Sequence, residues 1–318
     1  MSLHALEAID DALTATLRYR PQGLREWVWV GIVATAVASP GIGLSVGSNP
    51  DIPEESYDQL NELLAVATGE AAIAAVAALA AVWALFVIAG AFLEFPFIRW
   101  LRDGEAAIAE ETRQRWRQAL GLAVFRLVLQ AVPVAVVGWL VVGAVGGDPR
   151  PVEYVLAVSD YWLWLLATGT LVGVVGALTT AFVVPTMALS DRGVLGAWRR
   201  FWPTLTGSLT EFLAYAVAAT VFAYIGGLMV VVAAIVTFVV VAIPGLLLAM
   251  VAPMLSVTVL AVGGGALMTV AVIAVYAIVQ MYLRYYALFV LGYVDGDLDY
   301  AAERRQAVRS EESPADEA

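Results

Sequence analysis

The sequence contains no cysteine and no lysine, and its single histidine is His4. Without cysteine the chain can form no disulfide, no thiolate metal site and no thiol nucleophile. One imidazole is too few for the ligand clusters that hold zinc or haem. We therefore expect no cofactor, no metal site and no catalytic residue, and we do not expect an enzyme.

Charged residues are scarce, at 14% of the chain against about 25% in an average soluble domain. The charge is also unbalanced, because 17 basic residues, all arginines, face 28 acidic ones and the net charge is −11. Such a composition suits a surface that must stay hydrated in concentrated salt. A GC-rich genome that favours arginine codons would give the same result, and both explanations can hold. No basic patch is large enough to bind nucleic acid, so we exclude that partner.

Hydrophobic residues make up 61% of the 318 residues, and they fall in runs of twenty or more. A soluble protein of this size could not bury so much apolar surface. Because the runs lack polar alternation, they indicate helices rather than a β-barrel. We therefore predict an all-α polytopic transmembrane helix bundle surrounded by membrane lipids. The apolar stretches cover residues 27–44, 71–98, 120–145, 161–189 and 208–292.

The last stretch is too long for two ordinary spans. Its 85 residues contain only two charges, Glu211 and Arg284. Two spans of about 25–28 residues would leave about 30 residues over. Pro244, Pro253 and the glycines at 263–265 interrupt this surplus, which favours an apolar re-entrant or hairpin segment, although four full spans would also fit. For the whole chain we predict about six spans plus that segment.

The chain divides into three regions. Residues 1–26 contain an amphipathic helix, residues 27–292 form the bundle, and residues 293–318 are an acidic tail that we expect to be disordered and solvated. The amphipathic helix can lie flat at the lipid interface or pack against the ends of the bundle. Its apolar stripe consists of Leu3, Leu6, Ile9, Leu13 and Leu17.

The placement of arginine predicts the orientation. Fourteen of the 17 arginines lie in the N-terminal region, in the connections near residues 99–117 and 192–200, and in the tail. The connections on the other side contain only Arg150 together with many acidic residues. By the positive-inside rule both termini are cytoplasmic, and the number of crossings is even.

Aromatic residues follow the predicted boundaries. Anchoring in the interface is the usual role of such residues, and a ligand cage is the alternative. The interface motif that we single out on the cytoplasmic side comprises Trp198, Arg199, Arg200 and Trp202.

The connection near residues 99–117 has an aromatic–basic pattern similar to that of the interface motif, Arg115-Trp116-Arg117. The connections that contain these two patterns can therefore belong to an internal repeat.

Polar side chains within or near the apolar stretches are the candidate functional residues. Charges are costly there and mark either structural ion pairs or a transport or catalytic site. Glu211 and Arg284 should lie at similar depth on adjacent helices, so we predict that they pair. The remaining candidates are Glu94, Arg126, Gln130 and Gln280, and among these Glu94 and Arg126 are the further ion-pair candidates.

Five segments carry a family resemblance: 3–13, Phe182-Val183-Val184-Pro185, Asp191-Arg192-Gly193-Val194-Leu195, Trp198-Arg199-Arg200-Phe201-Trp202-Pro203-Thr204-Leu205 and 280–288. They resemble a family of uncharacterised multi-pass membrane proteins from halophilic archaea. More distantly, the span ending in proline and the following Trp–Arg helix resemble the membrane domain attached to some glycerophosphodiester phosphodiesterases. The catalytic barrel of those enzymes has no counterpart here, so the resemblance implies an all-α membrane fold and no activity.

Three functions agree with these observations. The first is a non-enzymatic scaffold or accessory protein, with another membrane protein or a second copy of the chain as partner. The second is a small-solute transporter or channel, although the interval from Gly226 to Gln280 lacks charges that a polar solute would need. The third is an intramembrane lipid enzyme, which the lack of convergent acid, histidine or cysteine disfavours.

Overall fold

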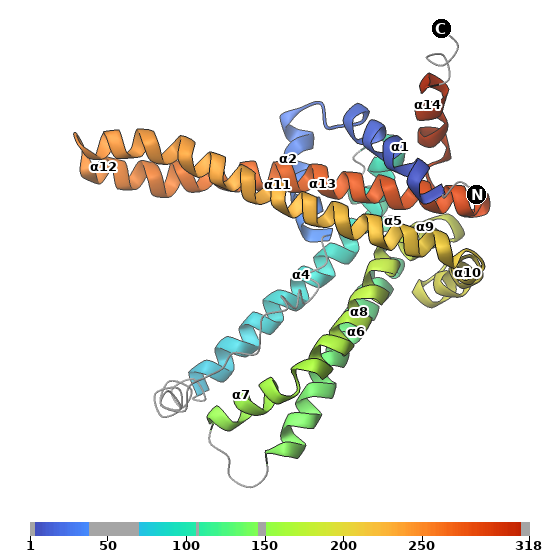
Figure 1. Ribbon diagram of the computed structural model, residues 1–318, viewed down its shortest axis with the longest axis horizontal. Helices are drawn as coiled ribbons and strands as arrows, with labels where there is room; N and C mark the ends of the chain where they lie inside the picture. The colour runs from blue at the N-terminus through green and yellow to red at the C-terminus, as the bar shows by residue number, and fades with distance from the viewer. Residues whose placement is uncertain (1–3, 38–69, 106–107, 146–150, 313–318) are drawn as a thin grey trace. The chain divides into compact units, whose positions relative to one another are not determined.

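The computed structural model describes residues 4–37, 70–105, 108–145 and 151–312, and every regular element within them is helical (Figure 1). This agrees with the predicted all-α fold. The first half contains α1 (His4–Arg18), α2 (Leu24–Val37), α4 (Glu70–Asp103), α5 (Ile108–Gln114), α6 (Trp116–Ala144) and α7 (Pro151–Asp160). The second half contains α8 (Trp162–Leu178), η2 (Thr179–Val183), α9 (Val184–Ser190), α10 (Val194–Gly207), α11 (Leu209–Ala249), α12 (Pro253–Thr258), η3 (Val259–Gly264), α13 (Gly265–Val294), η4 (Gly296–Leu298) and α14 (Ala302–Glu312).

Five helical segments of the described residues are long and apolar enough to cross a membrane. The sixth expected span, residues 27–44, is described only as far as residue 37, where α2 ends. The acidic connection at residues 51–69 lies outside the described residues. The total of about six spans therefore stays a prediction. The five segments are Ala77–Asp103, Trp116–Ala144, Trp162–Ser190, Leu209–Ala249 and Val259–Val294.

Much of the surplus of apolar residues after position 208 lies in the length of two helices, α11 and α13. The short α12 and η3 lie between them, where we expected the re-entrant or hairpin segment. The helix α11 continues through Pro244 for 41 residues, or about 60 Å. The chain reverses only at residues 250–252, and the glycines at 263–265 lie where η3 passes into α13. Proline interrupts the hydrogen bonding of a helix locally without ending it, so it is a weak predictor of a break in an apolar helix.

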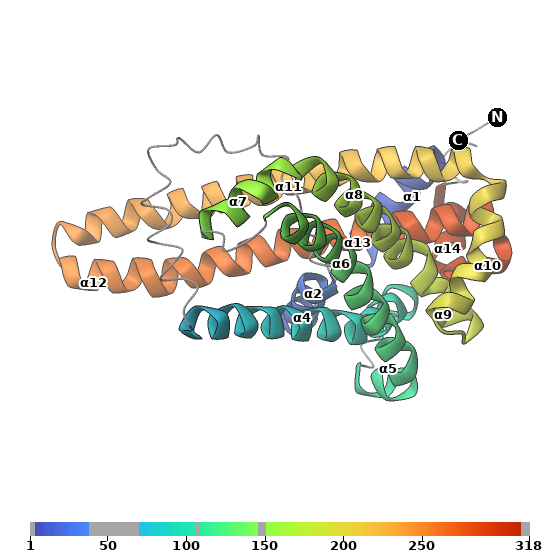
Figure 2. The same ribbon diagram turned by 90° about the horizontal axis from the view of Figure 1, so that it is seen from below.

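In both views α11 and α13 lie side by side as one long hairpin (Figure 2). Small residues allow the two helices to approach closely. A Cβ atom on Gly245 would collide with the side chain of Leu260, and one on Gly264 would collide with Val241. These glycines therefore contribute to packing rather than to the turn itself.

The chain forms two compact units. The first comprises Met1–Ala38, Leu93–Arg115 and Ala181–Ala318, and the second comprises Ser39–Phe92 and Trp116–Thr180. In the second unit α6 and α8 pack along each other. An apolar cluster there joins α6 to α7 through Val137, Val141 and Ala157.

The core of the first unit is the C-terminal half of α13, where Tyr285 to Gly292 are all buried. The helix α1 runs along it in the same direction, because Tyr286 Oη donates to the carbonyl of Ala5 and Tyr293 Oη donates to Asp11. Of the two placements that we considered for the N-terminal helix, the structure therefore has it packed against the bundle.

The face that α1 uses for this packing consists of alanines and not of the leucine stripe. Its four packing alanines are fully buried, whereas Leu6, Leu13 and Leu17 are 53%, 49% and 59% exposed. Small side chains let two helices approach closely, and that contact is available only on the alanine side. The packing alanines are Ala5, Ala8, Ala12 and Ala15.

The acidic tail is ordered further than predicted. Expected disorder after Asp295 is wrong for residues 296–312, which form η4 and α14. Apolar side chains of this segment are buried, with Leu298, Tyr300 and Val308 at most 4% exposed. Disorder was expected because the segment is rich in charge. These few apolar residues are nevertheless enough to pack it against the rest of the first unit.

The same order of elements occurs twice, as the proposed internal repeat requires. In each case a helix ends in a residue of left-handed conformation, Gly104 with φ 78° after α4 and Asp191 with φ 51° after α9. A shorter helix follows, α5 or α10, and then a long apolar helix, α6 or α11. Within the described residues no other residue has a positive φ, so this conformation marks the two corresponding turns.

Candidate functional site

Charged side chains of the first unit meet around the C-terminal half of α13, in what we call the polar layer. Its carboxylates come from five different helices or turns, and most are almost fully buried. They pair with arginines or with backbone N–H groups, so that the layer connects segments far apart in the sequence. The carboxylates of the polar layer are Asp11, Glu94, Glu111, Glu211 and Asp299.

The innermost contact of the polar layer is an ion pair between Glu94 on α4 and Arg284 on α13. Arg284 Nη2 donates to Glu94 Oε1, and the two residues are 6% and 0% exposed. The predicted pairing of Glu211 with Arg284 is therefore wrong. Glu94 and Arg284 were both ion-pair candidates from the sequence. Arg284 was expected to pair with Glu211 of α11, but it pairs with Glu94 of α4.

Glu211 has a different role, at the start of α1. Its Oε2 accepts a hydrogen bond of 3.0 Å from the backbone N–H of Ala5. The first N–H groups of a helix have no partner within the helix and carry partial positive charge, which makes a carboxylate favourable there. The sequence contains no signal for this contact, because the two residues are 206 positions apart.

Arg126 and Gln130 lie in the second unit, one turn apart on α6. Arg126 Nη2 donates to Thr180 Oγ1 over 2.8 Å, at the π-helical turn η2. Gln130 is 6% exposed, and its Oε1 accepts no hydrogen bond from the part of the chain that the structure describes. The π-helical turn is a feature that sequence reasoning missed.

Gln280, the remaining polar candidate, lies on α13 one turn before Arg284. Gln280 is hydrogen-bonded to Tyr276, which lies one turn earlier on the same helix. The structure thus places Gln280 and Arg284 on the helix that forms the core of the first unit.

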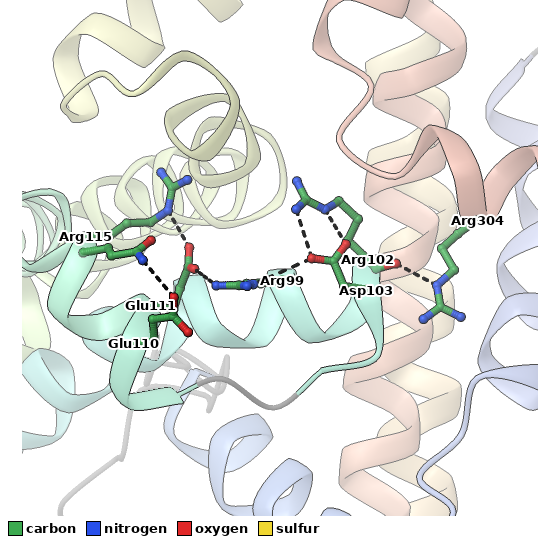
Figure 3. A network of polar contacts seen from close by, with 8 residues as sticks. Arg99, Arg102, Asp103, Glu110, Glu111, Arg115 and Arg304 are labelled. Atoms are coloured by element: carbon green, nitrogen blue, oxygen red, sulfur yellow. Dashed lines mark hydrogen bonds and ion pairs between the residues drawn. The ribbon is translucent and has the colours of Figure 1, made fainter.

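A network that sequence reasoning missed surrounds Glu111 on α5 (Figure 3). Glu111 is 4% exposed and accepts from Arg99 over 2.7 Å and from Arg115 over 2.5 Å. Arg304 Nε reaches across to the carbonyl of Arg102 over 2.8 Å. Spacings of four residues, such as those of Glu111 with Arg115 and of Arg99 with Asp103, could have indicated part of this network.

The C-terminal segment closes the polar layer. Arg309 Nε lies 3.3 Å from Asp11 Oδ2, and Arg305 pairs with the buried carboxylate of Asp299. Burial raises the pKa of Tyr300 to about 12, against the opposing effect of the Arg102 guanidinium above its ring. Tyr300 is therefore a neutral phenol at physiological pH.

The interface motif lies on α10 and is divided between two sides of that helix. Trp198 is half-buried and meets the ring of Phe201 edge-on at 5.9 Å. Arg199 and Arg200 are exposed, and Trp202 is 57% exposed. The motif is thus not a closed aromatic cage but a helix with one packed and one open side.

The chemistry of the polar layer is that of structural ion pairs. Guanidinium groups donate to carboxylates and backbone carbonyls, and these contacts join α4 to α13, α4 to α14 and α1 to α14. The backbone N–H of Ala5, which donates to Glu211, joins α1 to α11. In the residues that the structure describes, no three acidic or histidine side chains come together as a metal site would need. These features define a class: an all-α protein with membrane-capable helices, in which buried ion pairs connect helices of the first unit.

The chain belongs to a family described as "Family of unknown function (DUF7544)", whose model matches residues 3–301. The match includes all the helices from α1 to α13 and η4, and so contains the polar layer up to Asp299. No curated protein and no solved structure matches the chain.

Proposed function

We propose that this chain is a multi-pass integral membrane protein with both termini in the cytoplasm, and that it acts as a non-enzymatic scaffold or accessory protein. Five helices with the length and hydropathy of membrane spans support the membrane location. The distribution of arginine supports the orientation. A homo-oligomer or another membrane protein is the partner that we propose.

The observation that carries the scaffold role is the use of the polar groups. Glu94, Glu111 and Asp11 are each 4% exposed or less, and each is engaged by an arginine of another helix or turn. Such contacts fix the positions of helices relative to one another. A rigid layer of this kind supports the presentation of a surface, whereas a catalytic centre needs groups open to a substrate.

The orientation can be tested with single cysteines, since the chain has none of its own. The exposed positions Gln114, Thr206 and Gln306 suit labelling, whereas Ala197 is buried and does not. Cysteine at each of the three should react with an impermeant thiol reagent only after cell lysis. Cysteine at the exposed Asp160 should react on intact cells. Labelling of Gln306→Cys on intact cells would overturn the cytoplasmic C-terminus.

The scaffold role can be tested by photo-crosslinking in native membranes. A photoreactive amino acid at Gln114 or Gln306 should form an adduct of one defined mass, with a second copy or another protein. The same residue at Leu246, in the apolar hairpin, is the control and should give chiefly lipid adducts. If Gln114 and Gln306 give no protein adduct, the chain does not act as a scaffold through this side.

Transport of a small solute is the second candidate, and one observation favours it. Arg126 and Gln130 are buried on α6, and Arg126 donates to Thr180 in a π-helical turn, a feature that often occurs at functional sites. If this is a solute site, Gln130→Leu should abolish uptake into proteoliposomes without lowering the melting temperature. If the role is structural, this substitution changes stability only.

Two finer proposals concern origin and relationship. We propose that the chain comes from a halophilic archaeon, which its acidic, lysine-free composition supports. We also propose a distant relationship to the membrane domain attached to some glycerophosphodiester phosphodiesterases. The arrangement of a helix containing Pro185, a short turn and a Trp–Arg helix supports this relationship.

A further inference from the structure

One side of the helix α10 packs against the rest of the first unit. Val194, Ala197 and Phe201 are buried, and the ring of Phe201 stacks on Phe182 at 5.4 Å. Near the end of the helix, Thr204 Oγ1 donates to Asp295 Oδ2 over 2.7 Å. Because these contacts hold the helix in place, the opposite side is presented in a defined orientation.

That opposite side combines apolar and cationic residues. Leu195 and Trp202, two turns apart, are 68% and 57% exposed. Arg199 lies between them on the same side, with Arg200 next to it, and both arginines are exposed. Among the described residues neither arginine has a hydrogen bond or ion pair to another side chain.

The position of α10 along the chain places this side at the level of lipid headgroups. The segment Trp162–Ser190 ends four residues before α10, and the segment Leu209–Ala249 begins two residues after it. A helix that joins two membrane-capable segments directly must lie near the edge of the hydrocarbon region. Exposed Leu209 and Leu213 continue its apolar surface into α11.

The charge of this segment suits a phosphate group. No acidic residue occurs from Arg192 to Thr210, in a chain whose net charge is −11. Guanidinium groups bind phosphate oxygens with two parallel hydrogen bonds, and tryptophan favours the interface between headgroups and hydrocarbon. Exposed arginines beside an exposed tryptophan therefore fit a phospholipid better than a soluble polyanion.

We propose that the exposed side of α10 is a binding site for the headgroup phosphate of an anionic phospholipid. Arg199 and Arg200 bind the phosphate, while Trp202 and Leu195 insert at the level of the glycerol backbone. This inference rests on the proposed membrane location and is independent of the scaffold role.

The test compares lipid binding by three forms of the full-length protein in detergent. The wild type, R199Q/R200Q and R20Q/R25Q are titrated with phosphatidylglycerol or phosphatidylcholine, and bound lipid is counted by native mass spectrometry. Arg20 and Arg25 are also exposed, so the control loses the same charge elsewhere. Because each arginine near an anionic membrane surface contributes about 1 kcal/mol, R199Q/R200Q should bind phosphatidylglycerol about thirtyfold more weakly. The control should bind like the wild type.

Four outcomes would contradict the lipid site. Equal affinity for both lipids would show that charge is not recognised, and an equal loss in R20Q/R25Q would show only bulk electrostatics. Displacement of the lipid by millimolar inorganic phosphate would assign the site to a free anion. An unchanged affinity in R199Q/R200Q would place the lipid elsewhere. The melting temperature without lipid should be the same in all three forms, since the substituted residues are exposed.

The lipid site and the proposed function fail in different experiments. Absence of protein adducts from Gln114 and Gln306 removes the scaffold role and leaves the lipid titration unaffected. A chain that separates into the aqueous fraction without detergent overturns the membrane location and the lipid site together. An embedded protein that binds both lipids equally overturns the lipid site alone.

Discussion

At the scale of single residues, the ion pair of Glu94 and Arg284 is the most buried charge contact of the polar layer. Removing one partner leaves the other charge buried without compensation, at a cost of about 3–5 kcal/mol. We expect Glu94→Ala and Arg284→Ala each to lower the melting temperature strongly in detergent. The double variant should be more stable than either single variant. Additive losses, measured in the same thermal denaturation, would contradict a direct pair.

Glu211 provides the matched comparison, because it contacts the start of α1 and not Arg284. We expect Glu211→Ala to cost about 1 kcal/mol, the usual value of a helix N-terminal contact. Its effect should add to that of Arg284→Ala within about 0.5 kcal/mol. Partial rescue of Arg284→Ala by Glu211→Ala in chemical denaturation would restore the pairing that the sequence suggested.

The sequence identified which charges matter more reliably than it identified their partners. Glu94, Glu211 and Arg284 stood out because charges are rare in apolar stretches. Depth along a helix is readable from the sequence, but rotation about its axis and the choice of neighbouring helix are not. Depth therefore led to the prediction that Arg284 pairs with Glu211, whereas the packing of α4 against α13 brings Glu94 to it.

At the scale of helices, the packed face of α1 is not its apolar leucine stripe, although in most amphipathic helices the apolar stripe is the packed face. Its alanine face is packed and its leucine stripe is exposed. We expect Ala12→Leu to destabilise the protein by about 1–3 kcal/mol, because the larger side chain has no room against its neighbours. Leu13→Ala should change stability by less than about 0.5 kcal/mol. Thermal denaturation of both variants decides the matter, and the reverse order would show that the leucines are packed.

Helix lengths were the least predictable part of the fold. The apolar stretch after residue 208 contains proline and glycine at intervals that favour breaks, yet α11 continues for 41 residues. Apolar composition without charge gives no position at which a helix must end. The N-terminal helix was more readable, because Pro21 and Gly23 follow it and α1 ends at Arg18.

At the scale of the whole molecule, salt changes stability in two opposite ways, through the net charge and through the ion pairs. Salt screens the repulsion among 28 acidic residues, and it also weakens exposed pairs such as Arg309 with Glu7. The most buried pairs are screened less. We therefore expect the melting temperature to rise between about 0.1 M and 1 M KCl, where the Debye length falls to about 3 Å. A steady fall would mean that exposed ion pairs dominate stability.

Composition was sufficient to predict the all-α fold, because no other architecture accommodates such long apolar runs. It was insufficient for the C-terminal segment, where charged residues outnumber apolar ones and α14 nevertheless packs through Val308. A few buried side chains outweigh average composition when they meet a surface already formed by other parts of the chain.

The packing of α1 along α13 has a consequence for biosynthesis. Ala5 and Tyr286, which share a hydrogen bond, are 281 residues apart. At about 5–20 residues per second, a ribosome needs on the order of tens of seconds to add the second after the first. During that time Asp11 and the alanines of α1 have no α13 to contact. The helix α1 therefore reaches its final place only after α13 has been translated, and any chain truncated before α13 carries α1 unsupported.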